Sequence, residues 1–140
     1  QYHIKENQME YSDSLKKNND FQRVYRKGTS QANRYLVMYV LENHDRHMEN
    51  RLGISVSKKV GNSVVRHRVT RLIRESYRLN ERSFRQGLDI VVVARPNAKD
   101  KSYQEIESAL MHLAGRMKIR REAEVHSEES ENGSGQAGEQ

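Results

Sequence analysis

The sequence has 140 residues, no cysteine, 34% hydrophobic residues and a formal net charge of +6 at pH 7. This length fits one domain, and the lack of cysteine excludes disulfides, thiolate metal sites and cysteine nucleophiles. No apolar run reaches the ~18–20 residues of a membrane-spanning helix, and no signal-peptide pattern is present. We therefore expect a cytoplasmic protein with a small core and no membrane partner.

The charge is unevenly distributed along the chain. Residues 121–140 contain one basic and six acidic side chains, so the residues before them carry 24 basic and 13 acidic ones. A body with a net charge of +11 attracts polyanions, above all nucleic acid. We expect residues 15–120 to form the one folded domain, between a flexible N-terminal arm (1–14) and a disordered acidic tail (121–140).

The first half of the expected domain contains a helix and strands. In residues 18–27, Phe21 and Tyr25 share a side, which predicts a helix; Asn18 or Asn19 is placed to cap it, and Gly28 to end it in a left-handed turn. Residues 35–41 have the pattern of a largely buried strand, and residues 52–56 that of a half-buried one. The polar loop between them favours pairing as a hairpin.

The second half alternates helix, strand and helix. Residues 62–80 predict a long helix, and the β-branched run 89–94 predicts a central strand that Pro96 ends. Ser102 and Glu105 have the spacing of a capping box, and an amphipathic helix follows with Ile106 and Leu110 on its apolar side. This order of elements indicates an α+β sandwich with helices packed on one sheet.

The long helix carries a row of cations. At ~100° per residue, one stripe is apolar, with Ile73 at its edge. The opposite stripe and the first turn hold the basic side chains, namely Arg66, His67, Arg68, Arg71, Arg74 and Arg78. This spacing suits the phosphates of a nucleic-acid strand, which arginine binds bidentately. The alternative is a solvated face with intrahelical ion pairs, but Glu75 is the only acid in residues 61–78.

The segment before this helix extends the positive surface. Ser55, Ser57, Lys58 and Lys59 lie at the end of the strand that leads into it. Strand end, turn and helix start are therefore expected to form one continuous cationic surface.

Four blocks of the sequence resemble the protein subunit of bacterial ribonuclease P. They are LKKNNDFQRVYRKG (15–28), LGISVSKKVGN (52–62), RHRVTRLIRE (66–75) and IVVVAR (90–95). The resemblance covers about residues 15–117. It implies an α-β-β-β-α-β-α sandwich like domain 2 of ribosomal protein S5, with a left-handed βαβ crossover that carries the basic helix.

The resemblance also implies a function in tRNA 5′ maturation. In that family the RNA subunit is the catalyst and uses Mg²⁺, while the protein binds the catalytic RNA and the single-stranded 5′ leader of precursor tRNA. No catalytic residue, metal or cofactor is expected on the protein alone, and no DNA partner. By matching position, the leader cleft comprises Phe21, Tyr25, Val37, Tyr39, Ser55, Ser57, Lys58 and Lys59.

The basic helix is implied to contact the catalytic RNA through Arg66, His67, Arg68, Arg71, Arg74 and Arg78. His67 departs from the family, whose signature has Asn there. Independently of the resemblance, aromatic faces stack on unpaired bases with little sequence preference, at about 1–3 kcal/mol per base. Core packing is the alternative for Phe21 and Tyr25.

Other functions compete with this interpretation. An autonomous nuclease would depend on His67 as acid or base, although a lone histidine on a basic face more often meets phosphate. His44, His47 and Glu49 suggest either a metal site or a solvated loop. A general RNA-binding or ribosome-associated domain would share the basic helix. DNA binding is disfavoured because no helix-turn-helix partner is spaced to seat the long helix in a groove.

Overall fold

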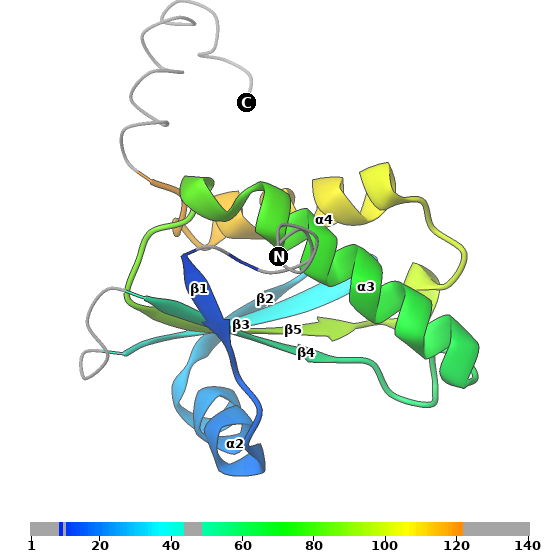
Figure 1. Ribbon diagram of the computed structural model, residues 1–140, viewed down its shortest axis with the longest axis horizontal. Helices are drawn as coiled ribbons and strands as arrows, with labels where there is room; N and C mark the ends of the chain where they lie inside the picture. Colours follow the sequence, from blue (N-terminus) through cyan, green and yellow to red (C-terminus); the bar gives the residue numbers. More distant parts are fainter. Residues whose placement is uncertain (1–8, 10, 44–48, 122–140) are drawn as a thin grey trace, which may run out of the picture.

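The computed structural model describes residues 9, 11–43 and 49–121, which form an α+β sandwich (Figure 1). Its elements follow the expected α-β-β-β-α-β-α order, with one additional short strand at the start. They are β1 (Ser12–Ser14), α2 (Asn18–Lys27), β2 (Thr29–Ala32), β3 (Leu36–Glu42), β4 (Asn50–Ser55), α3 (Ser63–Leu79), β5 (Leu88–Ala94) and α4 (Tyr103–Arg116), with short 3-10 turns at Glu81–Ser83 and Pro96–Ala98.

The five strands form one mixed sheet in the order β1-β4-β5-β3-β2. β4 pairs in parallel with β1 and β5, while β3 pairs antiparallel with β5 and β2. The predicted hairpin between β3 and β4 is therefore wrong, because β5 lies between them. Ile90, Val91 and Val92 of β5 are buried, on alternating faces of the sheet, which a central position satisfies.

The helices divide between the two faces of the sheet, with α3 and α4 on one side and α2 on the other (Figure 1). The larger core lies under α3 and α4, where Met38 and Ile90 of the sheet meet Ile73 and Leu110 of the helices. A much smaller cluster lies under α2 and consists of Leu15, Val24 and Val91. Part of the sheet face beside α2 thus remains accessible.

Helix starts agree with the sequence in two places and differ in one. Asn62 caps α3 by accepting a hydrogen bond from the Val65 backbone at 3.0 Å, and Ser102 and Glu105 form the predicted capping box of α4. The predicted asparagine cap of α2 is wrong, since Lys17 occupies that position without a side-chain cap. Asn18 and Asn19 lie within the helix.

Gly28 is needed for a different reason than predicted. Its φ of −84° is in the extended region, so the predicted left-handed turn is wrong. A Cβ atom here would lie 2.6 Å from the carbonyl oxygen of Val40 and 2.7 Å from that of Val24. Glycine therefore permits the end of α2 to approach β3 closely.

The described residues just before Leu15 include a short strand. Ser12–Ser14 pairs with β4, the Ser12 hydroxyl lies 2.8 Å from the Tyr77 hydroxyl, and the Tyr11 backbone donates to Glu81 at 2.7 Å. The predicted flexible arm is therefore wrong for Ser12–Ser14, whose polar side chains on an edge strand give no hydrophobic pattern. Residues 1–8 and 122–140 lie outside the described residues, so the rest of the arm and nearly all of the tail remain predictions.

Candidate nucleic-acid interface

α3 buries one side and presents the other to solvent. Val69, Ile73, Ser76 and Tyr77 are its buried residues, which places Ile73 at the centre of the apolar stripe and corrects its predicted position at the edge. The basic side chains occupy the remaining surface: His67, Arg68 and Arg71 are exposed, and Arg66, Arg74 and Arg78 are half-buried.

The arginines of α3 differ in their partners. Arg78 binds Glu75 through two hydrogen bonds of 2.6 and 3.1 Å, and the hydrogen bond from Arg78 holds the pKa of Glu75 below its usual value. Arg68 donates to the Lys101 carbonyl at 2.9 Å and Arg66 to that of Gly61 at 3.3 Å.

In the described part of the chain, Arg66, Arg68, Arg71 and Arg74 form no ion pair with a carboxylate. We call these four residues the arginine row. A depression of about 540 Å³ is lined by Arg71, Leu72, Arg74 and Glu75. Accessible guanidinium groups beside a concave surface can bind phosphate oxygens bidentately.

Aromatic side chains gather on the other face of the sheet, next to α2. The rings of Tyr25 and Tyr39 meet edge to face with centroids 4.9 Å apart, and Phe21 lies 6.4 Å from Tyr25. All three side chains are only partly buried. A Cβ atom on Gly53 would lie 2.7 Å from Cζ of Phe21, so this ring packs directly on the backbone of β4.

The register of the sheet arranges this face in three successive rows. The first joins Leu41, Asp89 and Arg51, the second Tyr39, Val91 and Gly53, and the third Val37, Val93 and Ser55. The second row lies under the aromatic rings of α2. We name Phe21, Tyr25, Val37 and Tyr39 the aromatic face.

The aromatic face and the arginine row are connected through the end of β4 and the turn that follows it. Ser55 is the last residue of β4 and belongs to the same row as Val37. Ser57, Lys58 and Lys59 follow it, are exposed and lead directly into α3. The predicted positive turn therefore joins the aromatic face to the arginine row.

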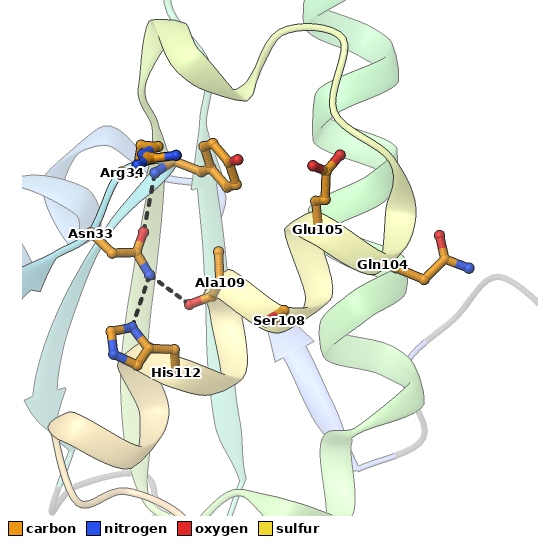
Figure 2. A pocket seen from close by; sticks show the side chains of 8 residues that line it. Asn33, Arg34, Gln104, Glu105, Ser108, Ala109 and His112 are labelled. Atoms are coloured by element: carbon orange, nitrogen blue, oxygen red, sulfur yellow. Dashed lines mark hydrogen bonds between the residues drawn. The ribbon is translucent and has the colours of Figure 1, made fainter. Parts of the chain in front are cut away.

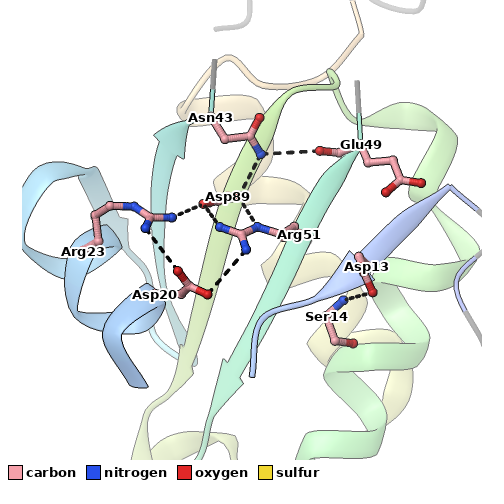
Figure 3. Close-up of polar contacts among 8 residues, drawn as sticks. All are labelled: Asp13, Ser14, Asp20, Arg23, Asn43, Glu49, Arg51 and Asp89. Atoms are coloured by element: carbon pink, nitrogen blue, oxygen red, sulfur yellow. Dashed lines mark hydrogen bonds and ion pairs between the residues drawn. The ribbon is translucent and has the colours of Figure 1, made fainter. Parts of the chain in front are cut away.

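A buried ionic cluster occupies the first row (Figure 3). Asp89, with a fully buried side chain, accepts hydrogen bonds from Arg51 at 3.0 and 2.8 Å, from Arg23 at 3.1 Å and from Asn43 at 2.8 Å. Asp20 accepts from Arg23 at 3.1 Å and from Arg51 at 3.4 Å. We name these five residues the Asp89 cluster.

The hydrogen bonds of the Asp89 cluster favour the ionised form of Asp89 despite its burial. Burial alone would raise the pKa of Asp89, but the hydrogen bonds from Arg51 and Asn43 and the nearby positive charge hold that pKa below its usual value. The hydrogen bond to Asp89 raises the pKa of Arg51 in turn. Sequence reasoning missed this cluster, although a lone carboxylate within the apolar run of β5 is a signal that a buried charge has a partner.

A second concave surface lies between the β2–β3 turn and α4, with a volume of about 370 Å³ (Figure 2). Asn33 organises it: its amide donates to the Ala109 carbonyl at 2.9 Å and contacts Nδ1 of His112 at 3.4 Å, while its oxygen accepts from the backbone of Tyr35 and Leu36. These bonds occupy both ends of the Asn33 amide, which therefore fixes the turn to α4.

The described residues contain neither a candidate metal cluster nor a candidate membrane-spanning helix. They contain no group of three or more His, Asp or Glu side chains that could hold a metal ion. Of the suggested site at His44, His47 and Glu49, both histidines lie outside the described residues. Within the described part, no helix is long and apolar enough to cross a membrane.

Comparison with known proteins identifies relatives of this architecture. The family model described as ribonuclease P matches residues 9–118. The ribonuclease P protein component of Lachnoclostridium phytofermentans is 64% identical over 108 residues, covering 77% of this chain and 91% of the relative. The ribonuclease P protein component of Alkaliphilus metalliredigens is 55% identical over 111 residues, covering 79% of this chain and 98% of the relative.

Solved structures agree with the sequence relatives. The RNase P protein of Staphylococcus aureus superimposes with a TM-score of 0.71 at 42% identity, covering 79% of this chain and 99% of that one. The RNase P protein of Thermotoga maritima gives a TM-score of 0.68 at 29% identity, with coverages of 74% and 96%.

Proposed function

This chain belongs to the bacterial ribonuclease P protein family and is thus a subunit of the endoribonuclease that processes tRNA 5′ ends. We propose that it binds the catalytic RNA through α3 and the 5′ leader of precursor tRNA through the aromatic face. The observation that carries this proposal is that the exposed turn after β4 connects two chemically different surfaces on the two sides of the sheet. One surface is cationic and the other is aromatic.

The arginine row is suited to structured RNA. Its guanidinium groups have no carboxylate partners among the described residues and project from one helix. Such groups neutralise phosphates and release counterions, which makes binding dependent on salt. His67 is exposed among these arginines, and in this proposal it also contacts an RNA phosphate.

The aromatic face is suited to an unpaired strand of variable sequence. Phe21, Tyr25 and Tyr39 are partly exposed aromatic rings, and rings of this kind stack on any base. Lys58 and Lys59 are exposed beside the end of β4, where they can follow the backbone phosphates. A leader that differs between tRNAs requires this sequence-tolerant mode of binding.

The chemistry itself belongs to the RNA in this proposal. The described acidic and histidine side chains include no group that fits a metal ion, so no step is assigned to a protein-bound metal. We place the Mg²⁺ of the reaction in the RNA-containing holoenzyme and the assembly in the cytoplasm. The protein's contribution is to hold the two RNAs in a fixed relation.

The test compares precursor tRNA with mature tRNA in a holoenzyme reconstituted with a bacterial ribonuclease P RNA. Replacing Tyr25 by Ala removes one stacking ring, which should weaken precursor binding ~5- to 150-fold, since stacking contributes about 1–3 kcal/mol per base. Tyr25→Phe retains the ring and should retain most of the affinity. Equal losses for precursor and mature tRNA would exclude a leader site here.

A nuclease activity of the protein alone is the competing function. Purified protein should not cleave precursor tRNA when the RNA subunit is omitted. Cleavage under these conditions that disappears in His67→Ala would favour the autonomous enzyme.

A further inference from the structure

The Asp89 cluster joins four separate segments of the chain. Asp89 belongs to β5, Arg51 to β4 and Arg23 to α2, while Asn43 directly follows β3. Because the Asp89 side chain is fully buried, it cannot itself contact RNA. Its four hydrogen bonds act entirely within the protein: two come from Arg51 of β4, one from Arg23 of α2 and one from Asn43 after β3.

Apart from these polar contacts, α2 rests on the sheet through a small apolar cluster. Val24 is its one fully buried side chain, within a cluster that is small compared with the core on the opposite face. Phe21 rests on Gly53 and is partly exposed. The polar contacts of Asp20 and Arg23 are therefore a large part of what sets the position of α2.

The cluster is adjacent to the aromatic face. On β5, Asp89 lies two residues from Val91, which pairs with Tyr39, and on β4, Arg51 lies two residues from Gly53. On α2, the cluster residue Asp20 directly precedes Phe21. A shift of α2 at the cluster therefore changes the spacing between Tyr25 and Tyr39.

We propose that Asp89 is a positioning residue for recognition of the 5′ leader, acting through Arg23, Arg51 and Asp20 to hold α2 at the distance where its aromatic rings meet Tyr39. This inference rests on the proposed function of the aromatic face. Binding of the catalytic RNA should not depend on the Asp89 cluster, because α3 packs on the opposite side of the sheet (Figure 1).

The experiment uses the full-length protein and three single variants. Asp89→Asn removes the central charge, and Asp20→Asn removes the less buried one, whose side chain is 16% exposed. Glu42→Gln is the matched control: it also removes one negative charge near an arginine, but its side chain is 53% exposed and 3.7 Å from Arg85. The control therefore reports the general effect of added positive charge on RNA affinity.

Three quantities are measured for each variant: the ratio of affinities for precursor and mature tRNA, the affinity for ribonuclease P RNA, and the Tyr25–Tyr39 ring contact by NMR. Relative to Glu42→Gln, the precursor-to-mature ratio should fall ~5-fold or more in both aspartate variants, since even one lost base stack has this effect. The ring contact should weaken, and the affinity for ribonuclease P RNA should remain that of the control.

Other outcomes overturn the inference. Folded variants that keep the ratio of the control, or that lose affinity for all RNAs equally, would show that the cluster has only a structural role. If Asp89→Asn does not fold, Asp20→Asn and Arg51→Lys decide by the same criteria. Tyr25→Ala separates the two proposals: if it alone lowers the ratio, leader binding stands and positioning by Asp89 fails, whereas if it too has no effect, leader binding fails.

Discussion

Asp89 illustrates how a single buried charge couples stability to pH. Its pKa is lower in the folded protein than its usual value, so the ionised form favours folding above the pKa of the unfolded chain, near ~3.9. This contribution is lost as the pH falls through the lower pKa of the folded state. Stability conferred by the Asp89 cluster should therefore disappear in acid and be fully present at neutral pH.

We predict that Asp89→Asn lowers the free energy of unfolding at pH 7 by up to about 3–5 kcal/mol, because it leaves the mostly buried Arg51 with only its longer 3.4 Å contact to the Asp20 carboxylate. The difference in free energy of unfolding between Asp89→Asn and the native sequence should shrink as the pH is lowered below about 4. Urea denaturation between pH 7 and pH 2 measures both effects, with Glu42→Gln as an exposed control. Parallel stability curves for Asp89→Asn and the native sequence would show that Asp89 is not the titrating group.

Gly53 is a second residue whose identity is set by a neighbour. A methyl group at this position would lie 2.7 Å from Cζ of Phe21 and 3.1 Å from Cβ of Leu15. Gly53→Ala should therefore displace the ring of Phe21 and destabilise the protein by about 1–3 kcal/mol, as is usual for an overpacked site.

Gly115 provides the matched control for that substitution. It lies in α4, where an added Cβ would meet nothing nearer than Cδ of Arg120 at 4.0 Å. Gly115→Ala should stabilise the helix by roughly 0.5–1 kcal/mol. The urea midpoint should fall for Gly53→Ala and rise for Gly115→Ala. An unchanged midpoint for Gly53→Ala would mean that the Phe21 ring can move without a loss of stability.

At the level of single elements, α3 combines free and paired arginines in one helix. Arg71→Ala removes one unpaired charge, so the salt dependence of binding to ribonuclease P RNA should become shallower by about one unit of log affinity per log salt. Glu75→Gln should have the opposite effect, because it removes a negative charge from the RNA-facing side of α3. Affinity measured from 0.1 to 0.5 M salt tests both variants, and unchanged slopes would remove α3 from the interface.

The elements that sequence predicted well are those with local signals. α3 and α4 have apolar periodicity together with the caps of Asn62 and Ser102, and both signals arise within a few residues. The residue patterns alone missed β2, which only the family resemblance implied, because its sequence, TSQA, is polar and three of its four residues are exposed. The order of the strands could not be read from loop lengths, since the insertion of β5 depends on how both faces of the sheet are covered.

At the scale of the whole molecule, the arrangement of the helices on the sheet explains why the candidate site was only partly predictable. Residue types and the family resemblance placed Phe21, Tyr25 and the arginines on plausible surfaces. The contact between Tyr25 and Tyr39, however, depends on α2 crossing a sheet whose order was not predicted. The Asp89 cluster depends on the same arrangement, because its members are separated by up to 69 positions in the chain.

Charge also acts at the scale of the whole molecule. Residues 127–140 contain four glutamates and no lysine or arginine, so deleting them raises the formal net charge from +6 to +10. A more positive protein attracts RNA more strongly at low ionic strength. We expect the deletion to strengthen binding to ribonuclease P RNA roughly two- to five-fold at 0.1 M salt, with no benefit near 1 M, where the Debye length is about 3 Å.

Charge and chain length can be separated by a second variant. Replacing Glu128, Glu129, Glu131 and Glu139 with glutamine keeps all 140 residues while removing the same negative charge. If electrostatic competition is the cause, this variant should bind RNA as tightly as the truncated protein, and both should melt at the temperature of the native sequence. A lower melting temperature for the truncation alone would instead indicate that residues 127–140 contribute to the fold, and that the tail acts by more than its charge.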